Sequence, residues 1–390
     1  MHYKTKKALV QENQTILSDF TIQRPKLSIK QEDSLTWLLN AHVRAEQTKN
    51  SPGKEELSSF KEKLKEKLYH VACKSHQVSE RGHDLEDFLF DEYEKMPIYS
   101  LHENPSGKSI TDRTKKYKEV VDNVFRRFYE KDTEGPDDII HVSCTGYVAP
   151  SGAQMLVSEK NWDTTVTHAY HMGCYASVPA VRMANGFLAS SAKSQYAVDV
   201  VHTEVCSLHT NPSLHKVDQL VSQSLFADGY IRYRIKNQTY HKAPHFKLLA
   251  SKEYIVPDST DKMSWMVNDW GFELYIAKEI PVLIARNLKP YLEALCAKGN
   301  LSTDILKTAL FAVHPGGPKI LDHIKALLDL KDDQIQYSYE ILYKYGNMSS
   351  ATLPHVWEKI LEKEQGSPYV ISLAFGPGLS ICGLILKMEK

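Results

Sequence analysis

Short runs of β-branched and other apolar residues alternate with segments of helical periodicity through much of the chain. Residues 139–144, 166–170 and 197–202 form such runs, and residues 175–188 carry apolar side chains at helical spacing. A short apolar run bounded by turn residues is typical of a buried strand, whereas apolar residues every three or four positions indicate a helix with one buried face. The alternation therefore predicts an α/β fold in which helices cover the faces of a sheet.

The carboxyl-terminal third repeats this alternation. An apolar run at residues 311–313 enters the turn-rich segment 314–318, and a helical segment follows. Residues 369–375 and 381–386 read as two more strands around a Gly-Pro-Gly turn. The same layered α/β organisation is therefore expected in this part of the chain.

The expected domain organisation is two related halves, residues 1–237 and residues 238–390, although no residue-level repeat links them. The amino-terminal region has a different texture, because it is rich in lysine and glutamate. Residues 55–68 place leucines at helical spacing between charged residues. This pattern predicts an amphipathic surface helix.

Charge and hydropathy exclude several classes of protein. Forty-eight basic residues balance 48 acidic ones among 390 residues, so no overall field favours a nucleic acid or a membrane surface. No apolar run approaches the roughly 20 residues of a membrane span, and the lysine-rich residues 1–10 are not followed by the apolar core of a secretory signal. We expect a cytoplasmic protein whose six scattered cysteines are reduced thiols that hold no metal.

Cys174 stands at a position that favours a nucleophile. It follows Gly173 between the predicted strand ending at Tyr170 and the predicted helix beginning at Tyr175. The amino terminus of a helix carries about half a positive charge and free amides, which lower the pKa of a thiol and can hold an oxyanion. The alternative interpretation is a buried structural cysteine.

His314 and Asn347 occupy two further turns. His314 opens a His-Pro-Gly-Gly-Pro segment, where proline and glycine fix the backbone and leave the imidazole projecting, and Asn347 follows Gly346 near a predicted helix start. A hydrogen-bonded loop histidine and a helix-capping asparagine are the alternatives. Together with Cys174 they form a Cys/His/Asn set, in which imidazole stabilises a thiolate and imidazole plus amide donate to a thioester oxyanion.

Five separated stretches share a distinctive order along nearly the whole chain. They are residues 173–176, 220–229, 311–318, 346–351 and 375–379. In their residues and order they resemble the type III polyketide synthases, the chalcone synthase-like family of the thiolase superfamily. The resemblance implies a homodimer of αβαβα-layered subunits that needs no cofactor. It also implies that Cys174 accepts the acyl group while His314 and Asn347 bind the extender thioester.

The resemblance further suggests how the substrate pocket is lined. Phe226 matches a family phenylalanine that lies between the thioester tunnel and the pocket. Leu274 replaces a second family phenylalanine, and its smaller side chain is expected to widen the cavity. Simple core packing is the alternative for Phe226.

Cys206 and His209 match two more pocket-lining positions. His209 is either a titratable pocket wall or a hydrogen-bonded structural histidine. The turn Gly376-Pro377-Gly378 is expected behind the nucleophile. Pro377 has no amide hydrogen to donate to an oxyanion, so that task is assigned to the amide of Cys174.

The resemblance leaves the acyl donor open. The family's coenzyme A-binding basic cluster falls here on Leu68, Val71 and Ser75. The nearby residues that could substitute for its charges are Lys67, Lys74 and Arg81. Without them, the acyl group is expected to arrive on the phosphopantetheine arm of a carrier protein. Residues 168–172 look more like the bacterial stand-alone ketosynthases that join two acyl chains into an α-pyrone.

We therefore expect an acyltransferase of polyketide or α-pyrone biosynthesis. It would load Cys174, condense a malonyl- or β-ketoacyl-derived carbanion onto the acyl group, and release the product by lactonisation. Its partners would be thioesters of coenzyme A or of acyl carrier protein. Two alternatives stay open: a β-ketoacyl synthase III-like enzyme that primes fatty-acid synthesis, and a catalytically silent thiolase-fold scaffold that binds a carrier protein.

Overall fold

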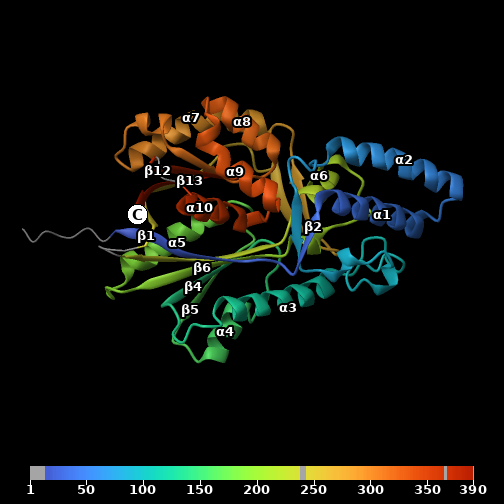
Figure 1. The fold of residues 1–390 in the computed structure, drawn as a ribbon, viewed down its shortest axis with the longest axis horizontal. Helices are drawn as coiled ribbons and strands as arrows, with labels where there is room; N and C mark the ends of the chain where they lie inside the picture. Colours follow the sequence, from blue (N-terminus) through green and yellow to red (C-terminus); the bar gives the residue numbers. More distant parts are fainter. Residues whose placement is uncertain (1–13, 238–242, 364–366, 390) are drawn as a thin grey trace, which may run out of the picture.

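One mixed β-sheet runs through the molecule (Figure 1). A computed structural model describes residues 14–237, 243–363 and 367–389, so the segment 1–10 considered above lies outside the described residues. Within them, nine strands are ordered β11-β12-β13-β8-β1-β7-β6-β4-β5. These strands are β1 (Thr15–Gln23), β4 (Asp138–Ser143), β5 (Thr165–Tyr170), β6 (Ala197–Glu204), β7 (Gly229–Asn237), β8 (His245–Ile255), β11 (Leu310–Val313), β12 (Tyr369–Gly376) and β13 (Ser380–Glu389).

Helices and two small hairpin sheets complete the described part of the chain. The hairpin sheets pair β2 (Leu27–Lys30) with β3 (Glu80–His83) and β9 (Met263–Val267) with β10 (Phe272–Ile276). The α-helices are α1 (Gln31–Asn50), α2 (Lys54–Val71), α3 (Ile110–Phe128), α4 (Gly152–Lys160), α5 (Ser177–Ser190), α6 (Val217–Leu225), α7 (Ile280–Lys298), α8 (Pro318–Leu328), α9 (Asp332–Tyr345) and α10 (Thr352–Lys363).

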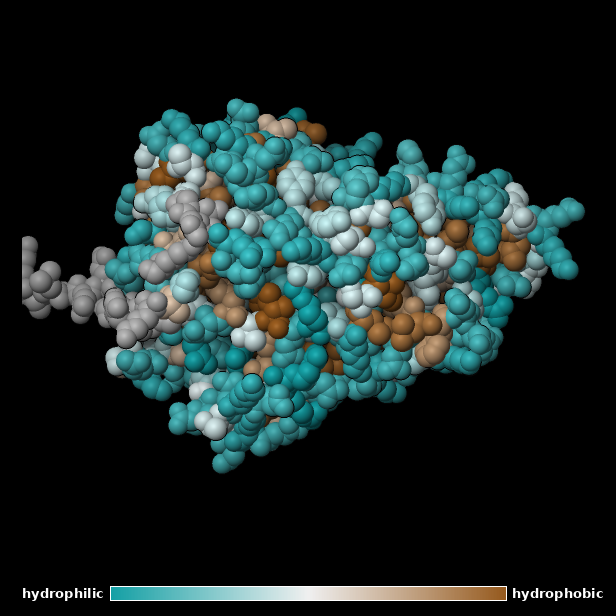
Figure 2. Space-filling model, in the orientation of Figure 1, coloured by the Kyte–Doolittle hydropathy of each residue, from teal (hydrophilic) through white to brown (hydrophobic). Residues whose placement is uncertain are grey.

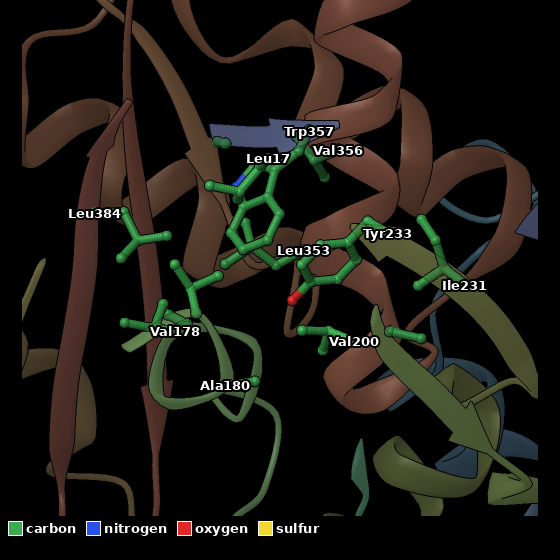
Figure 3. Close-up of a cluster of buried hydrophobic side chains, with 14 of the residues drawn as sticks. Leu17, Val178, Ala180, Val200, Ile231, Tyr233, Leu353, Val356, Trp357 and Leu384 are labelled. Carbon is green, nitrogen blue, oxygen red and sulfur yellow. The ribbon is translucent and has the colours of Figure 1, made fainter. Parts of the chain in front are cut away.

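The central layer of the fold consists of α5 and α10. Val178 of α5 and Trp357 of α10 belong to one buried cluster with Tyr233 of β7 and Leu384 of β13, and Figure 3 shows these side chains meeting between the ribbons. Because β7 and β13 lie on opposite sides of β1 in the sheet, its two ends enclose this pair of helices. The helices therefore bury apolar surface on two sides, which explains the fully buried Trp357.

The outer faces of the sheet are covered by separate sets of helices. A second buried cluster joins α1 to α4 with residues of β4, β6 and β7. A third joins α7, α8 and α9 with residues of β8 and β11 to β13. The layers are therefore outer helices, one end of the sheet, the central helices, the other end of the sheet and outer helices. This order confirms the predicted thiolase-like αβαβα fold. The strands before and after residue 237 lie in different parts of the sheet, and the division into two related halves stays a prediction.

The predicted secondary structure agrees with the structure except at one helix start. The six apolar runs correspond to β4, β5, β6, β11, β12 and β13, and residues 55–68 lie in α2. The helix expected from Tyr175 begins two residues later, at Ser177. The reason is a turn, in which the Ala176 amide donates to the Gly173 carbonyl at 3.1 Å.

Parallel strands direct their carboxyl ends to common edges of the sheet. β4 runs parallel to β5 and to β6, and β11 runs parallel to β12. In open α/β sheets, ligands bind outside the carboxyl ends of the strands. Three of the five sequence-predicted stretches, those with Cys174, His314 and Gly376, follow or end these strands, and Cys206 follows β6.

The surface in Figure 2 is largely hydrophilic, with apolar residues in small separate patches. In the described ranges, no helix is both long enough and apolar enough to cross a membrane. On α2, Leu64 and Leu68 are buried while the lysines between and before them are exposed. This is the amphipathic pattern expected from the sequence.

Candidate active site

Cys174 lies in the turn between β5 and α5, and is partly exposed. The preceding Gly173 has a φ of 93°, which side chains other than glycine rarely adopt. A β-carbon at Gly173 would also lie 2.8 Å from Cδ of Pro377. Glycine at this position therefore lets the turn that contains Cys174 approach the turn that follows β12.

Two side chains from the segment after α9 face the Cys174 thiol. The Ser349 hydroxyl oxygen lies 3.9 Å from Sγ, and the Asn347 side chain lies near enough to the sulfur to influence its pKa. Burial raises the pKa of the Cys174 thiol to about 12, while hydrogen bonds from Ser349 and Asn347 act to lower this pKa. The expectation that the helix terminus lowers the thiol pKa is therefore wrong for the free protein, because desolvation is the larger effect.

Asn347 is held by both its backbone and its side chain. Its amide donates to the Leu225 carbonyl at 3.0 Å, and its carbonyl accepts from the Ala227 amide at 2.9 Å. Its Oδ1 accepts hydrogen bonds from the Ser349 amide at 2.9 Å and from the Thr352 hydroxyl at 3.3 Å. Because Oδ1 is engaged, the NH2 group is the end of the carboxamide that can donate to the sulfur or to a ligand.

His314 directly follows β11, where its amide donates to the Leu373 carbonyl at 2.7 Å. The side chain is 3% exposed, and neither ring nitrogen has a hydrogen-bond partner among the described residues. Burial lowers the pKa of the imidazole to about 3. The ring is therefore neutral at pH 7 and has one donor and one acceptor nitrogen to offer a ligand.

A series of contacts brings the three stretches together. A β-carbon at Gly317, in the turn after His314, would lie 3.5 Å from Cδ2 of Leu225, and the Leu225 carbonyl binds the Asn347 amide. The Asn347 carboxamide in turn faces Cys174. The structure thus brings Cys174 and Asn347 together directly, and brings the His314 turn to the same region through Leu225.

The Gly-Pro-Gly turn packs against the turn that contains Cys174. Besides the contact of Pro377 with Gly173, a β-carbon at Gly376 would lie 1.9 Å from Cδ1 of Tyr175. Only glycine therefore fits at the end of β12 without displacing the Tyr175 ring. Gly378 continues the turn with a φ of 102°.

The two pocket positions Phe226 and Leu274 lie in different surroundings. Phe226 is half-buried and forms an isolated β-bridge with Asn347. Leu274 on β10 lies directly opposite Trp265 on β9, so both side chains share one face of the hairpin. The Trp265 indole donates to the Cys144 carbonyl at 2.6 Å. The Trp265 ring therefore lies beside Leu274. The sequence-based prediction of a wider cavity at Leu274 did not take this ring into account.

The contacts of His209 are those of a hydrogen-bonded structural histidine, one of the two interpretations considered from the sequence. One ring nitrogen lies 2.7 Å from the Thr145 carbonyl, and the other accepts a hydrogen bond from the Phe272 amide at 3.1 Å. The ring also stacks on Phe272 at a centroid distance of 4.4 Å. Burial lowers its pKa to about 3, so the His209 ring is neutral at pH 7. Cys206 is 8% exposed, and burial raises its pKa.

Glu204, at the end of β6, is a site residue that the sequence reasoning missed. Its fully buried carboxylate accepts hydrogen bonds from the Cys144 amide at 3.0 and 3.1 Å, from the Thr145 hydroxyl at 2.8 Å and from the Ser350 hydroxyl. Burial raises the pKa of Glu204 to about 7. The available signal was a carboxylate just beyond the apolar run 197–202.

Cys144 connects this carboxylate with the nucleophile turn. Its sulfur accepts from the Gly173 amide at 3.0 Å and lies 3.1 Å from the Gly173 carbonyl. Glu204, through the Cys144 amide, therefore helps to fix the residue before Cys174. Nothing in the spacing of Cys144 along the chain distinguished it from the other cysteines.

The raised pKa of Glu204 predicts a pH-dependent stability. A carboxyl whose pKa is higher in the folded than in the unfolded state destabilises the fold as the pH rises between the two values. The free energy of unfolding of the wild type, relative to Glu204→Gln, should therefore fall by up to about 3 kcal/mol between about pH 4 and about pH 8. Chemical denaturation of both proteins across this range checks it, and a constant difference would contradict it.

The basic residues near the expected thioester entrance differ in accessibility. Lys67 is exposed and donates to the His215 carbonyl at 2.7 Å, and Lys74 is partly exposed. Arg81 is only 2% exposed and bonds the carbonyls of Gln223 and Phe226. The prediction that Arg81 could substitute for the coenzyme A-binding charges is therefore wrong, because its guanidinium is buried and hydrogen-bonded to backbone carbonyls.

Sequence comparisons place the chain among polyketide synthases. The family described as "Chalcone and stilbene synthases, C-terminal domain" matches residues 247–389. The chain is 31% identical over 293 residues to "Probable polyketide synthase 1" of Dictyostelium discoideum, covering 72% of this chain and 9% of that protein. It is 26% identical over 344 residues to "Type III polyketide synthase C" of Arabidopsis thaliana, covering 83% of this chain and 86% of that protein.

The first relatives are much longer proteins. The chain covers 9% of "Probable polyketide synthase 1" and 10% of "Polyketide synthase 37", both of Dictyostelium discoideum. It therefore spans about a tenth of their length.

Solved structures agree with the sequence comparisons. The C-terminal type III polyketide synthase domain of Steely1, a type I/III hybrid from Dictyostelium, superposes with a TM-score of 0.80 at 26% identity, covering 96% of this chain and 99% of that one. PKS-I from the brown alga Ectocarpus siliculosus shares the fold with a TM-score of 0.81 at 21% identity, covering 96% and 98%. The chain belongs to the type III polyketide synthases, the chalcone synthase-like family.

Proposed function

We propose that the protein is a polyketide-forming condensing enzyme that carries its growing acyl chain on Cys174. The single observation that supports this function best is the approach of the Asn347 carboxamide to the Cys174 thiol. A donor beside a nucleophilic sulfur can stabilise the oxyanion of a thioester. The family supports a condensing function in general terms.

Acylation of Cys174 is the first proposed step. The thiol proton moves to the neutral His314 imidazole, and the sulfur attacks the carbonyl of an acyl thioester. The C–S bond of the donor breaks, and the donor thiol leaves with a proton. The pKa of the thiol is raised by burial and that of the imidazole is lowered by burial. A thiolate and an imidazolium formed together would offset this cost for each other.

Condensation is the second proposed step. A malonyl thioester loses carbon dioxide, and the electron pair of the broken C–C bond forms an enolate. His314 and Asn347 donate hydrogen bonds to its oxygen. The enolate carbon attacks the acyl carbonyl, a new C–C bond forms, and the bond to Cys174 breaks. The released sulfur takes up a proton. The His314 ring has no other partner among the described residues, which leaves it free for this role.

Release by lactonisation is the finer part of the proposal. An enol oxygen of the extended chain would attack its own thioester carbonyl and displace the thiol, giving an α-pyrone. A β-ketoacyl extender in place of malonyl would give the pyrone of two joined chains, as in the bacterial stand-alone ketosynthases. We also propose a homodimer, on family resemblance alone.

The acyl donor is proposed to be a carrier-protein thioester. Of the three charges considered as substitutes for the coenzyme A-binding cluster, Arg81 is buried, which leaves Lys67 and Lys74. A carrier protein supplies its own docking surface and depends less on charges at the tunnel entrance. A coenzyme A thioester relies on local cations for its phosphates.

A panel of matched thioesters tests the proposed function. The purified protein is incubated with malonyl thioester and starters of several lengths, each presented on coenzyme A and on acyl carrier protein, and products are identified by mass spectrometry. We expect condensed polyketide products, pyrones among them, formed faster from carrier-protein donors by about tenfold or more. Equal rates from both donors would contradict the carrier-protein proposal, and linear single-condensation products would favour a fatty-acid priming enzyme.

A further inference from the structure

Arg81 is a buried cation whose contacts lead to Asn347. It lies on β3 with 2% of its surface exposed. Its Nη1 donates to the carbonyls of Gln223 at 2.9 Å and Phe226 at 2.8 Å, and its Nε donates to Oε1 of Gln31 at 2.9 Å. All three acceptors are uncharged oxygens. A guanidinium is rarely buried without a carboxylate partner unless such hydrogen bonds compensate for desolvation.

Arg81 binds the carboxyl end of α6. The last carbonyls of a helix have no partner within the helix and carry partial negative charge. In α6, the Gln223 carbonyl binds Arg81, and the Ser224 carbonyl accepts from Nε2 of Gln31 at 2.7 Å. Arg81 fixes that Gln31 side chain through Nε. Arg81 and the Gln31 carboxamide that it orients thus supply hydrogen-bond donors to two of the last carbonyls of α6, those of Gln223 and Ser224.

The next carbonyl of α6 binds Asn347 itself. The Leu225 carbonyl accepts from the Asn347 amide at 3.0 Å, and the Asn347 carbonyl accepts from the Ala227 amide at 2.9 Å. Arg81 also lies close to the residue before Asn347, since a β-carbon at Gly346 would lie 3.2 Å from its Cγ. Movement of the end of α6 would therefore move Asn347, whose carboxamide faces Cys174.

We propose that Arg81 is a positioning residue for Asn347. Its guanidinium fixes the carboxyl end of α6, and the isolated β-bridge between Phe226 and Asn347 transmits this to the carboxamide. The catalytic part of this inference rests on the proposed function of Asn347. The charge matters because it opposes the negative end of the helix, and the planar fork matters because it reaches Gln31 and two carbonyls at once.

Two variants and a matched control test the inference in the full-length protein. Arg81→Met removes the charge and the donors, whereas Arg81→Lys keeps the charge but cannot reproduce all three hydrogen bonds. Arg234→Lys is the control, because Arg234 is a partly buried arginine that bonds both oxygens of Asp199 on β6, away from α6. Hydrogen exchange of residues 346–351 is measured in each protein, along with the rates of Cys174 acylation and of condensation.

Arg81→Met should increase exchange in residues 346–351 by about tenfold and lower condensation by about tenfold or more relative to acylation. Arg81→Lys should lie between this variant and the wild type, and Arg234→Lys should change neither ratio. If Arg81→Met does not fold, Arg81→Lys decides by the same measurements. Unchanged exchange in a folded Arg81 variant would overturn the proposal, as would equal losses of acylation and condensation.

A failure of the proposed function is distinguishable from a failure of this inference. Asn347→Ala is measured in the same assays. If that variant leaves the ratio of condensation to acylation unchanged, the proposed role of Asn347 fails. Hydrogen exchange still decides whether Arg81 holds the segment, because it requires no substrate.

Discussion

Cys174→Ala is expected to abolish the covalent acyl adduct that forms when the protein is incubated with an acyl thioester. The sulfur is the only group removed, and no acyl enzyme can form on a methyl side chain. Condensation should fall by at least roughly 10³-fold, in line with the loss of other enzymatic nucleophiles. Intact-protein mass spectrometry measures the adduct, and peptide mapping locates it.

A matched cysteine variant controls for loss of a thiol. Cys296→Ala removes a thiol from α7 that is 1% exposed and belongs to the buried cluster of α7, α8 and α9. It should retain the adduct with the same stoichiometry as the wild type. An adduct that survives Cys174→Ala at the same stoichiometry would exclude Cys174 as the acyl acceptor.

Asn347→Ala is expected to leave acylation within a few-fold of the wild type and to lower condensation by about 10²- to 10³-fold. This is the usual cost of removing one hydrogen-bond donor to an oxyanion. Acylation should be spared because Cys174 and His314 are untouched. Single-turnover measurements of adduct formation and of carbon dioxide release separate the two steps.

Asn347→Asp sharpens the test, because it keeps the shape of the side chain. One carboxylate oxygen can still accept from the Ser349 amide and the Thr352 hydroxyl, but the donor that faces Cys174 is lost. Condensation should be as defective as in Asn347→Ala. A fully active Asn347→Asp, or a loss confined to acylation in either variant, would contradict the donor role.

Six strands were predictable because their apolar runs are short and bounded by turns. Five of these strands are largely buried, whereas β5 at the edge of the sheet is largely accessible. The turn before α5 was not predictable, because residues 175–188 have helical spacing whether the helix begins at Tyr175 or at Ser177. The candidate nucleophile could be identified from Gly173-Cys174 and its position after a strand. Its pKa could not, because burial by distant segments raises it.

The roles of residues that position other residues could not be predicted from the sequence. Arg81 stood as a possible surface charge, since arginine is rarely buried, and only the docking of β3 against α6 shows its interior partners. Glu204 is separated by 59 residues from Thr145 and by 146 from Ser350, which both hydrogen-bond to it. Spacing along the chain carries no information about partners at such separations.

The placement of β1 in the middle of the sheet has a consequence for how the chain assembles. This strand pairs with β7 on one side and β8 on the other, and Thr15 meets Asn237 across a separation of 222 residues. Contacts between distant parts of a chain form late and slow folding. After its synthesis β1 must therefore wait for its partners in the sheet until the residues of β7 and β8 have been translated. Without β1, the strands β7 and β8 would lose the strand that joins them, and the sheet would be divided into two separate parts.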